Sequence, residues 1–360
     1  MLARHAIVRL LPAVLLALFI APAARAQSCA GDLNGDYLVN GADIGILLNA
    51  WGQCTDGNYG CLGDLNRDGT VNGADLGLLV GAWGICPPVN GVPVWATLID
   101  FDPDPAIVLD PAQRLRIRAT GLAWRVRDTA TQIEMLLVPP GTFQMGCIMG
   151  SNQDGCFSLE QPVHEVTLTN AFYLGRYEVT QSQWVARMGS NPSRFQGQSD
   201  SAIRPVEQVS WNAVEGYLSA TGFRLPTEAE WEYACRAGTQ TPFHSGPGFP
   251  NGTTDNNLVS QIAWFYCNDG CTTKPVGGKA ANAFGFYDML GNVWEWVNDW
   301  YGRYTSAAQT DPTGPASASY RVIRGGSWDS DAINARSSTR SQDSPRYANS
   351  TFGFRVARTP

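Results

Sequence analysis

The sequence predicts a modular globular protein in which a small duplicated unit precedes one large, turn-rich domain. Of its 360 residues, 44% are hydrophobic and 16% are charged, so the chain is too apolar to be disordered. Its 38 glycines and 12 tryptophans indicate irregular structure around aromatic packing rather than long helices. The formal net charge is -7, whereas a nucleic-acid-binding protein usually has an excess of basic residues. We therefore expect no nucleic-acid partner.

The N-terminal segment has the pattern of a secretory signal peptide. Arg4 and Arg9 precede an apolar run over residues 10–23, and Ala24-Arg25-Ala26 follows it. This order of basic, apolar and small-x-small regions predicts cleavage near Ala26. The run is too short to span a bilayer, so we expect a secreted, periplasmic or cell-surface protein without a transmembrane anchor. The alternative is a buried N-terminal helix.

Export favours disulfide bonds among the nine cysteines. Cys235 is the odd one. Spacing cannot prove connectivity, so the pairings are hypotheses. They are Cys29 with Cys54, Cys61 with Cys86, Cys147 with Cys156, and Cys267 with Cys271.

Residues 29–86 contain two copies of one motif, CAGDLNGDYLVNGADIGILLNAWGQC and CLGDLNRDGTVNGADLGLLVGAWGIC, in a 32-residue register. Oxygen-bearing side chains occupy loop positions 1, 3, 5, 9 and 12, and the position-7 carbonyls complete the set. Hard cations prefer this all-oxygen arrangement, which predicts one Ca²⁺ site per copy. The ligands are Asp32, Asn34, Asp36, Leu38, Asn40 and Asp43 in the first loop, and Asp64, Asn66, Asp68, Thr70, Asn72 and Asp75 in the second.

Each loop leads into one amphipathic helix. Apolar residues recur at i, i+3, i+4 and i+7. They are Ile44, Leu47, Leu48 and Trp51, then Leu76, Leu79, Val80 and Trp83.

The duplicated loop and helix resemble a dockerin type I module. The resemblance implies a small all-α unit with two EF-hand-type calcium loops and a cohesin-like partner, contacted through Gly41-Ala42 and Gly73-Ala74. The alternative is a calcium-stabilised stalk without a cohesin. Loop position 6 is Gly69 in the second copy but Tyr37 in the first, so we expect weaker calcium binding by the first loop.

Residues 87–116, rich in Pro, Asp and Val, are predicted to be a linker to a large domain over 117–358. Two capping boxes mark helix starts in that domain, Thr180 with Gln183 and Thr227 with Glu230. The acids of the second helix are expected to cap it and to face solvent rather than to catalyse. They are Glu228, Glu230 and Glu232.

Six segments of the large domain, in this order, resemble the formylglycine-generating enzyme (sulfatase-modifying factor) family. The resemblance covers residues 120–358 and implies an α+β, C-type-lectin-like fold with little regular secondary structure. The segments are MLLVPPGTFQMG, YLGRYEVTQSQW, PVEQVSWNAVEGYLSATGFRLPTEAEWEYACRAGT, NAFGFYDMLGNVWEW, RVIRGGSW and FGFRVAR.

The resemblance implies an activity that two positions of this chain do not support. Enzymes of the family oxidise a sulfatase cysteine to formylglycine, using O2 and copper(I) held by two cysteines. Counted from Ser327, those positions hold Ser330 and Ala335. Neither is a thiolate, the ligand that copper(I) prefers, so we expect no copper and lean towards no catalysis. Related iron enzymes use three histidines, whereas only His164 and His244 remain after export.

The resemblance also implies calcium in the large domain, held by Asp288, the carbonyls of Gly291 and Val293, and Glu295. A second family site maps onto Asn257, Leu258 and Asp269.

These observations predict a secreted, non-catalytic binding domain tethered to an extracellular assembly through the dockerin-like module. We expect a peptide or glycan ligand in the family's groove. The alternatives are an oxidase acting on sulfatase cysteines, and a structural cell-surface component or an accessory protein of polysaccharide degradation. The groove residues are Arg324, Ser327, Trp328, Ser330 and Arg336.

Overall fold

The computed structural model describes residues 31, 33, 38–54, 63–66, 68–81, 83–85, 91–147, 156–246, 248–255, 257–266, 268 and 270–360. The chain divides into two compact units, Met1–Cys86 and Pro87–Pro360. Several predicted features lie outside the described residues. They are the signal peptide, Cys29, Asp32, Asn34, Asp36, Cys61, Cys86, Cys267 and Asp269.

The small unit contains helices α1 (Gly41–Asn49) and α2 (Gly73–Gly81), one from each copy of the motif. It also has two short antiparallel strand pairs, β1 (Leu38–Val39) with β4 (Gly84–Ile85) and β2 (Gly52–Gln53) with β3 (Thr70–Val71). The described part of this unit is therefore helical with short strands rather than purely α.

The predicted apolar face of these helices is only partly buried. Leu47 and Leu79 are fully enclosed, whereas Trp51 and Trp83 are 50% and 55% exposed. The prediction of one helix after each loop is confirmed, and Trp51 and Trp83 lie beyond the ends of these two nine-residue helices. Leu48 and Val80, at equivalent positions of the two copies, are exposed as well.

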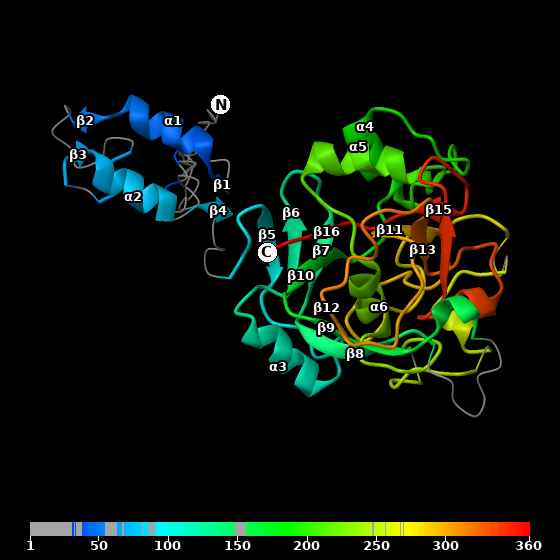
Figure 1. The fold of residues 1–360 in the computed structure, drawn as a ribbon. Coiled ribbons are helices and arrows are strands. Elements are labelled where there is room, and N and C mark those ends of the chain that lie inside the picture. The colour runs from blue at the N-terminus through cyan, green and yellow to red at the C-terminus, as the bar shows by residue number, and fades with distance from the viewer. Residues whose placement is uncertain are drawn as a thin grey trace, which may run out of the picture. The chain divides into compact units, whose positions relative to one another are not determined.

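The large unit is built on three sheets (Figure 1). A five-stranded antiparallel sheet has the order β16-β10-β7-β6-β5, a four-stranded sheet the order β14-β13-β11-β15, and a three-stranded sheet the order β12-β9-β8. The strands are β5 (Ala96–Asp100), β6 (Arg125–Asp128), β7 (Glu134–Val138), β8 (Gly141–Met145), β9 (His164–Leu168), β10 (Phe172–Gly175), β11 (Trp294–Trp300), β12 (Gln309–Thr310), β13 (Arg321–Arg324), β14 (Arg340–Asp343), β15 (Phe352–Gly353) and β16 (Ala357–Arg358).

Part of the predicted linker belongs to the large unit. Strand β5 pairs with β6 at the edge of the five-stranded sheet, and α3 (Pro111–Ala119) begins at an Asp110 cap. Trp95 and Val108 join the hydrophobic core. The Pro and Asp residues that suggested a linker instead lie at the ends of these short elements, where they cap or terminate them.

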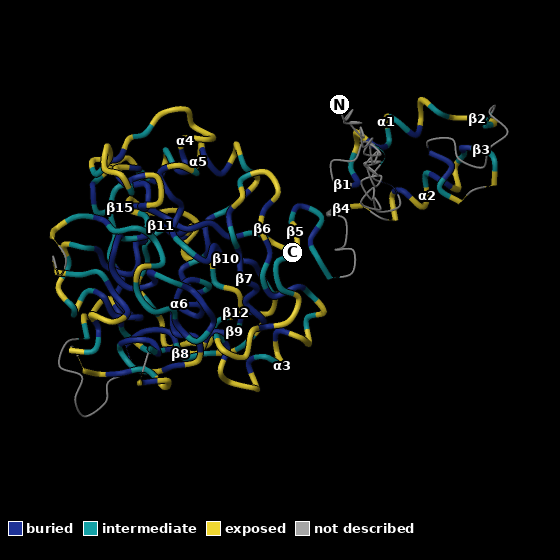
Figure 2. Tube along the Cα trace, turned by 180° about the vertical axis from the view of Figure 1, so that it is seen from behind, coloured by how far each residue is buried: buried dark blue, intermediate teal, exposed yellow. Residues whose placement is uncertain are grey.

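Two further helices, α4 (Gln181–Met188) and α5 (Trp211–Thr221), lie side by side (Figure 1). Helix α6 (Glu228–Arg236) lies among buried segments (Figure 2), and all but one of its residues are buried. Both predicted capping boxes are confirmed, at the starts of α4 and α6. None of the helices in the described part of the chain is long and apolar enough to cross a bilayer.

Candidate functional site

The segment from Arg324 to Arg336 begins with a turn that requires glycine. Gly325 and Gly326 follow β13 with φ of +96° and +79°. A Cβ on Gly326 would lie 2.8 Å from the carbonyl oxygen of Asn334. This close approach folds the segment back on itself and brings Ser327 next to Ser330.

Ser330 and Ala335, the two positions predicted to match the family's copper-binding cysteines, hold groups that are already engaged or buried. The Oγ atoms of Ser330 and Ser327 lie 3.0 Å apart, and Ser330 Oγ also accepts the Ser327 N–H. Ala335 is fully buried. Among the described cysteines only Cys235 is free, and burial raises the pKa of its thiol to about 12. That thiol therefore stays protonated at neutral pH.

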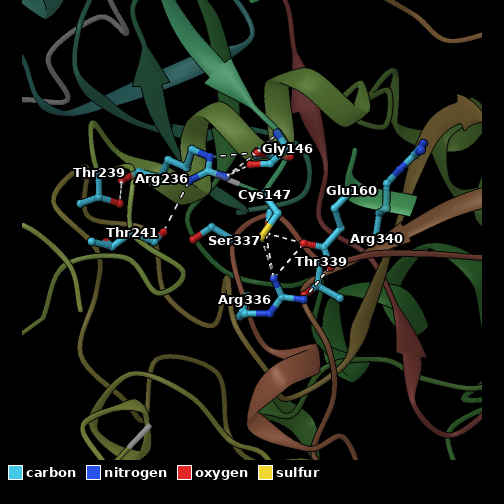
Figure 3. Close-up of polar contacts among 12 residues, drawn as sticks. Gly146, Cys147, Glu160, Arg236, Thr239, Thr241, Arg336, Ser337, Thr339 and Arg340 are labelled. Carbon is cyan, nitrogen blue, oxygen red and sulfur yellow. Dashed lines mark hydrogen bonds and ion pairs between the residues drawn. The ribbon is translucent and has the colours of Figure 1, made fainter. Parts of the chain in front are cut away.

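Arg336 is engaged in a buried ion pair (Figure 3). Its guanidinium donates to both oxygens of Glu160, at 2.6 and 2.8 Å. Its Nη1 also lies 3.4 Å from the Sγ of Cys147, which forms the predicted disulfide with Cys156. Cys54 and Cys271 are disulfide-bonded too. The ion pair joins Arg336 to the segment that carries Glu160 instead of leaving it free for a ligand.

Arg324 lies in the core and does not line a surface. Its side chain pairs with Glu232 and donates to the carbonyl of Ser338 at 2.8 Å. Burial opposes the charge of Glu232, but Arg236 and Arg324 together lower the pKa of this acid. The expectation that Glu228 and Glu232 face solvent was wrong, because arginines of other elements neutralise them inside the fold.

The exposed part of the segment is aromatic and polar. Trp328 is half-buried, donates from Nε1 to the Ser350 carbonyl at 3.1 Å and meets Phe195 edge-on at 5.4 Å. Tyr266 is 69% exposed, and its N–H donates to the Ser330 carbonyl at 2.8 Å. Of the predicted groove residues, only Trp328 and Ser330 therefore reach the surface. No signal in the sequence pointed to Tyr266 or Phe195.

The predicted calcium residues of the large domain surround a buried turn. Asp288 accepts the Gly277 N–H at 2.6 Å through Oδ2, while its buried Oδ1 has no hydrogen-bond partner among the residues that the structure describes. Burial raises the pKa of Asp288 to about 6. Glu178, which the sequence did not single out, accepts the Val293 N–H at 3.1 Å, and its pKa is raised chiefly by burial and then by Asp288.

Glu295 has other partners in this structure. Its carboxylate binds Arg355 at 2.6 Å and accepts the Trp231 indole N–H at 2.8 Å. The orphaned Asp288 oxygen fits a calcium ligand, whereas Glu295 fits one only if it leaves Arg355. Asn257 of the second predicted site lies on the exposed surface and donates to Asp255.

In the small unit, the predicted ligands organise their own loops. Asp75 accepts the N–H groups of Leu65 and Asn72, at 2.8 and 2.9 Å. Asp43 accepts the equivalent N–H groups of Leu33 and Asn40 at the same distances. In both copies the loop residues at positions 9 and 12 thus cap the helix that follows.

The second loop shows how this arrangement suits a cation. Gly69, at position 6, has φ of +87° and donates its N–H to Asp64 at 2.9 Å. Burial would raise the pKa of Asp75, but the backbone N–H groups of Asn72, Asn66 and Leu65 lower it below its ordinary value. Position 12 is therefore an ionised carboxylate, as a calcium ligand must be.

Comparison with known families agrees with this division of the chain. Residues 124–360 match the family described as sulfatase-modifying factor enzyme 1-like domain. Residues 30–81 match the dockerin type I domain. The chain therefore belongs to the sulfatase-modifying factor enzyme 1-like family and carries a dockerin type I domain ahead of that domain.

Individual relatives support the family and the fold. The formylglycine-generating enzyme of Mus musculus is 31% identical, with 62% of this chain and 74% of the relative covered. The serine/threonine-protein kinase pkn1 of Chlamydia caviae is 36% identical. The match covers 62% of this chain but only 38% of the length of that protein.

Two solved structures share the fold. Treponema denticola variable protein 1 has a TM-score of 0.56 and 31% identity, with 63% of this chain and 95% of that chain covered. PvdO from Pseudomonas aeruginosa has a TM-score of 0.55 and 30% identity, with 66% of this chain and 98% of that chain covered. The large unit thus has the mixed helix-and-sheet fold of this family.

Proposed function

We propose that this protein is an exported, non-catalytic binding protein that its dockerin domain attaches to an extracellular assembly. The proposal rests on the pair Ser330 and Ala335, which stand where the family's oxidase has its two copper-binding cysteines. A hydroxyl and a methyl group do not supply the soft thiolates that copper(I) requires. The cleavable signal peptide over residues 1–26 is part of the proposal.

The surface around Trp328 is the proposed ligand-binding region. Trp328, Tyr266 and Asp329 are at least partly exposed there, while the neighbouring polar groups of Ser327 and Arg336 are paired within the protein. Aromatic and carboxylate side chains on a rigid turn suit a peptide or a glycan.

The test is direct. The purified full chain is incubated with copper, O2 and a CxPxR-type peptide, and the peptide is analysed by mass spectrometry. We expect no conversion and no copper(I) binding. The double variant Ser330→Cys/Ala335→Cys serves as the matched comparison and is expected to bind copper(I). Conversion of the peptide by the unaltered protein would overturn the proposal in favour of the oxidase.

Ligand screening distinguishes a purely structural role from a ligand-binding role. A glycan and peptide array is probed with the full chain and with Trp328→Ala, and we expect binding that this substitution abolishes. Exposed Tyr320 is the matched control, and Tyr320→Ala should retain binding. An array without any signal would favour the structural cell-surface component.

For the dockerin domain we propose two calcium ions and a cohesin partner. Dockerin domains typically bind calcium and, in general, a cohesin. Gly41-Ala42 and Gly73-Ala74 are exposed at the starts of α1 and α2, in equivalent positions. Two equivalent faces predict that Ala42→Arg or Ala74→Arg alone leaves binding intact and that the double variant loses it. The probe is a cohesin domain from the same organism. Absence of binding would favour the alternative, in which this domain is a calcium-stabilised stalk without a cohesin partner.

Calorimetry tests the calcium sites. We expect tighter binding by the second loop, and Asp75→Asn should remove that site while Asp43→Asn spares it. Equal calcium affinities of the two loops would contradict the prediction that Tyr37 weakens binding by the first loop.

In the large domain we propose calcium held by Asp288, Gly291, Val293 and Glu295, with Asn257, Leu258 and Asp269 as a second site. Calcium should then raise the melting temperature of the large unit, and Asp288→Asn should abolish that rise.

A further inference from the structure

A cavity of about 430 Å³ lies under the chain segment 302–315, and none of the predicted groove residues lines it. Its wall brings together four side chains from distant parts of the sequence. His164 comes from β9, Glu228 from α6, Asp299 from β11 and Arg340 from β14. The volume falls in the range of about 300–1,000 Å³ that is usual for small-molecule sites.

One charge pair in this wall is complete. Arg340 binds both oxygens of Glu228 at 2.7 Å and donates to the carbonyl of Gly302 at 2.8 Å. The Tyr304 hydroxyl donates to Glu228 at 3.0 Å. The positive charge of Arg340 is therefore neutralised within the protein and does not call for an anionic ligand.

Asp299 lacks such a partner. Its side chain lines the cavity, although the residue is only 3% exposed. Oδ2 accepts the backbone N–H of Glu228 at 2.8 Å. Within the described part of the chain, Oδ1 accepts no hydrogen bond and no arginine or lysine forms an ion pair with this carboxylate. A buried carboxyl group without a paired cation is unfavourable in its charged form. Arg303 and Arg340 line the cavity but form no ion pair with Asp299 among the described residues, so a cationic ligand would stabilise this carboxylate.

His164 adds a second unused acceptor. Its Nδ1 lies 3.2 Å from the Pro162 carbonyl. Because a carbonyl can only accept, Nδ1 carries the proton and Nε2 presents a lone pair in the neutral ring. The ring meets Tyr304 edge-on at 4.8 Å, and His164 is 3% exposed. Among the residues that the structure describes, none donates to Nε2.

We infer that this cavity binds the ammonium group of a small organic amine, such as a lysine side chain, with Asp299 as its counter-ion and His164 as a hydrogen-bond acceptor. The Nε2 atom of His164 and the ionised form of Asp299 accept hydrogen bonds, and an ammonium group offers three donors and one positive charge. A bare metal ion fits poorly. In the described residues, the ligand atoms of at least three His, Cys, Asp or Glu side chains lie within 4.8 Å of one another only at Cys147, Cys156 and Glu160.

The protonation of Asp299 makes the inference measurable. Burial, and then the charge of Glu228, raises the pKa of Asp299 to about 8. The other ionisable groups around the cavity or acting on this acid are His164, Glu230, Arg303, Tyr304, Arg321 and Arg340. At pH 7 the amine must therefore displace the proton of Asp299. Affinity should rise about tenfold per pH unit up to about pH 8.

The experiment is calorimetry on the full chain with Nα-acetyl-lysine methylamide as the probe. Its uncharged norleucine analogue and glucose are the comparison ligands. We expect only the amine to bind. Titrations at pH 7 in two buffers with different ionisation heats should show release of about one proton per amine bound. Binding of the norleucine analogue or of glucose with equal affinity, absence of amine binding at pH 8.5, or a pH-independent affinity would overturn the inference.

Matched variants locate the site. Asp299→Asn keeps an oxygen for the Glu228 N–H but cannot become an anion, so it should weaken amine binding at least tenfold and abolish proton release. His164→Phe keeps the ring beside Tyr304 without the Nε2 acceptor and should weaken binding less. Asp104→Asn, exposed and outside the cavity, should bind as the unaltered protein does. Near-ultraviolet circular dichroism verifies folding. Unchanged amine binding by a folded Asp299→Asn would refute the site.

Discussion

The segment Ser327–Arg336 and the cavity beneath residues 302–315 differ in how their polar groups are satisfied. In the segment, Ser330 bonds to Ser327 and Arg336 pairs with Glu160. In the cavity, one oxygen of Asp299 and the Nε2 of His164 have no hydrogen-bond partner among the described residues. Ser330 and Arg336 have their polar interactions within the protein, whereas Asp299 and His164 keep acceptor atoms that a ligand could use.

This contrast separates the segment that the resemblance singles out from the part of the large unit whose polar groups are not satisfied within the protein. In this turn Ser327 and Ser330 form a hydroxyl pair, Ala335 is buried and Arg336 forms an ion pair with Glu160. The acceptor atoms of Asp299 and His164 line a cavity, where a ligand can reach them. Four predictions test the comparison, from the largest expected effect to the smallest.

Arg324→Met should lower the free energy of unfolding of the large unit by about 3–5 kcal/mol, because it leaves the buried acid Glu232 with one arginine fewer. Arg303→Met, at an exposed position, should change it by less than about 0.5 kcal/mol. Urea unfolding followed by tryptophan fluorescence measures both. Equal stabilities would mean that Arg324 belongs to a surface groove after all.

Asp299→Asn should change how stability depends on pH. The folded pKa of Asp299, about 8, lies above its ordinary 3.8, so the folded state holds the proton more tightly. The unaltered protein therefore loses about 1 kcal/mol per pH unit, relative to the variant, between pH 4 and pH 8. Below pH 4 the difference becomes constant. Urea titrations at several pH values measure this slope. If the free energies of unfolding of the two proteins depended on pH in the same way, Asp299 would not be an unpaired buried acid.

Gly314→Ala, in the segment 302–315 that lines the cavity, should lower the free energy of unfolding of the large unit by about 1–2 kcal/mol. Gly314 has φ of +71°, and a Cβ there would lie 2.9 Å from the Trp300 carbonyl. Gly248→Ala is the matched control, since Gly248 has φ of +81° but nothing within 4 Å. Thermal unfolding should show a larger loss for Gly314, and equal losses would mean that the close contact is unimportant.

Ser330→Ala should cost only about 1 kcal/mol, the worth of its hydrogen bonds to Ser327. The exposed control Ser319→Ala should be neutral within about 0.5 kcal/mol. A large loss on urea unfolding would show that the turn depends on Ser330 far more than one neutral hydroxyl pair explains.

Local patterns predicted much of the fold. The capping boxes at Thr180 and Thr227, the Cys147–Cys156 disulfide and the free Cys235 are found as predicted. Each depends on residues a few positions apart or on the composition of one helix face. The exposed Trp51 and the strand β5 within the predicted linker were missed, because burial there depends on which element packs opposite.

The sequence by itself determined the family and the duplicated loops, because these are matters of residue identity and spacing. Only the tertiary structure decided which charges are paired. Glu232 meets Arg324 across 92 positions, and Asp299 meets the N–H of Glu228 across 71. Contacts at such separations arise from how sheets and helices pack, and no local pattern records them.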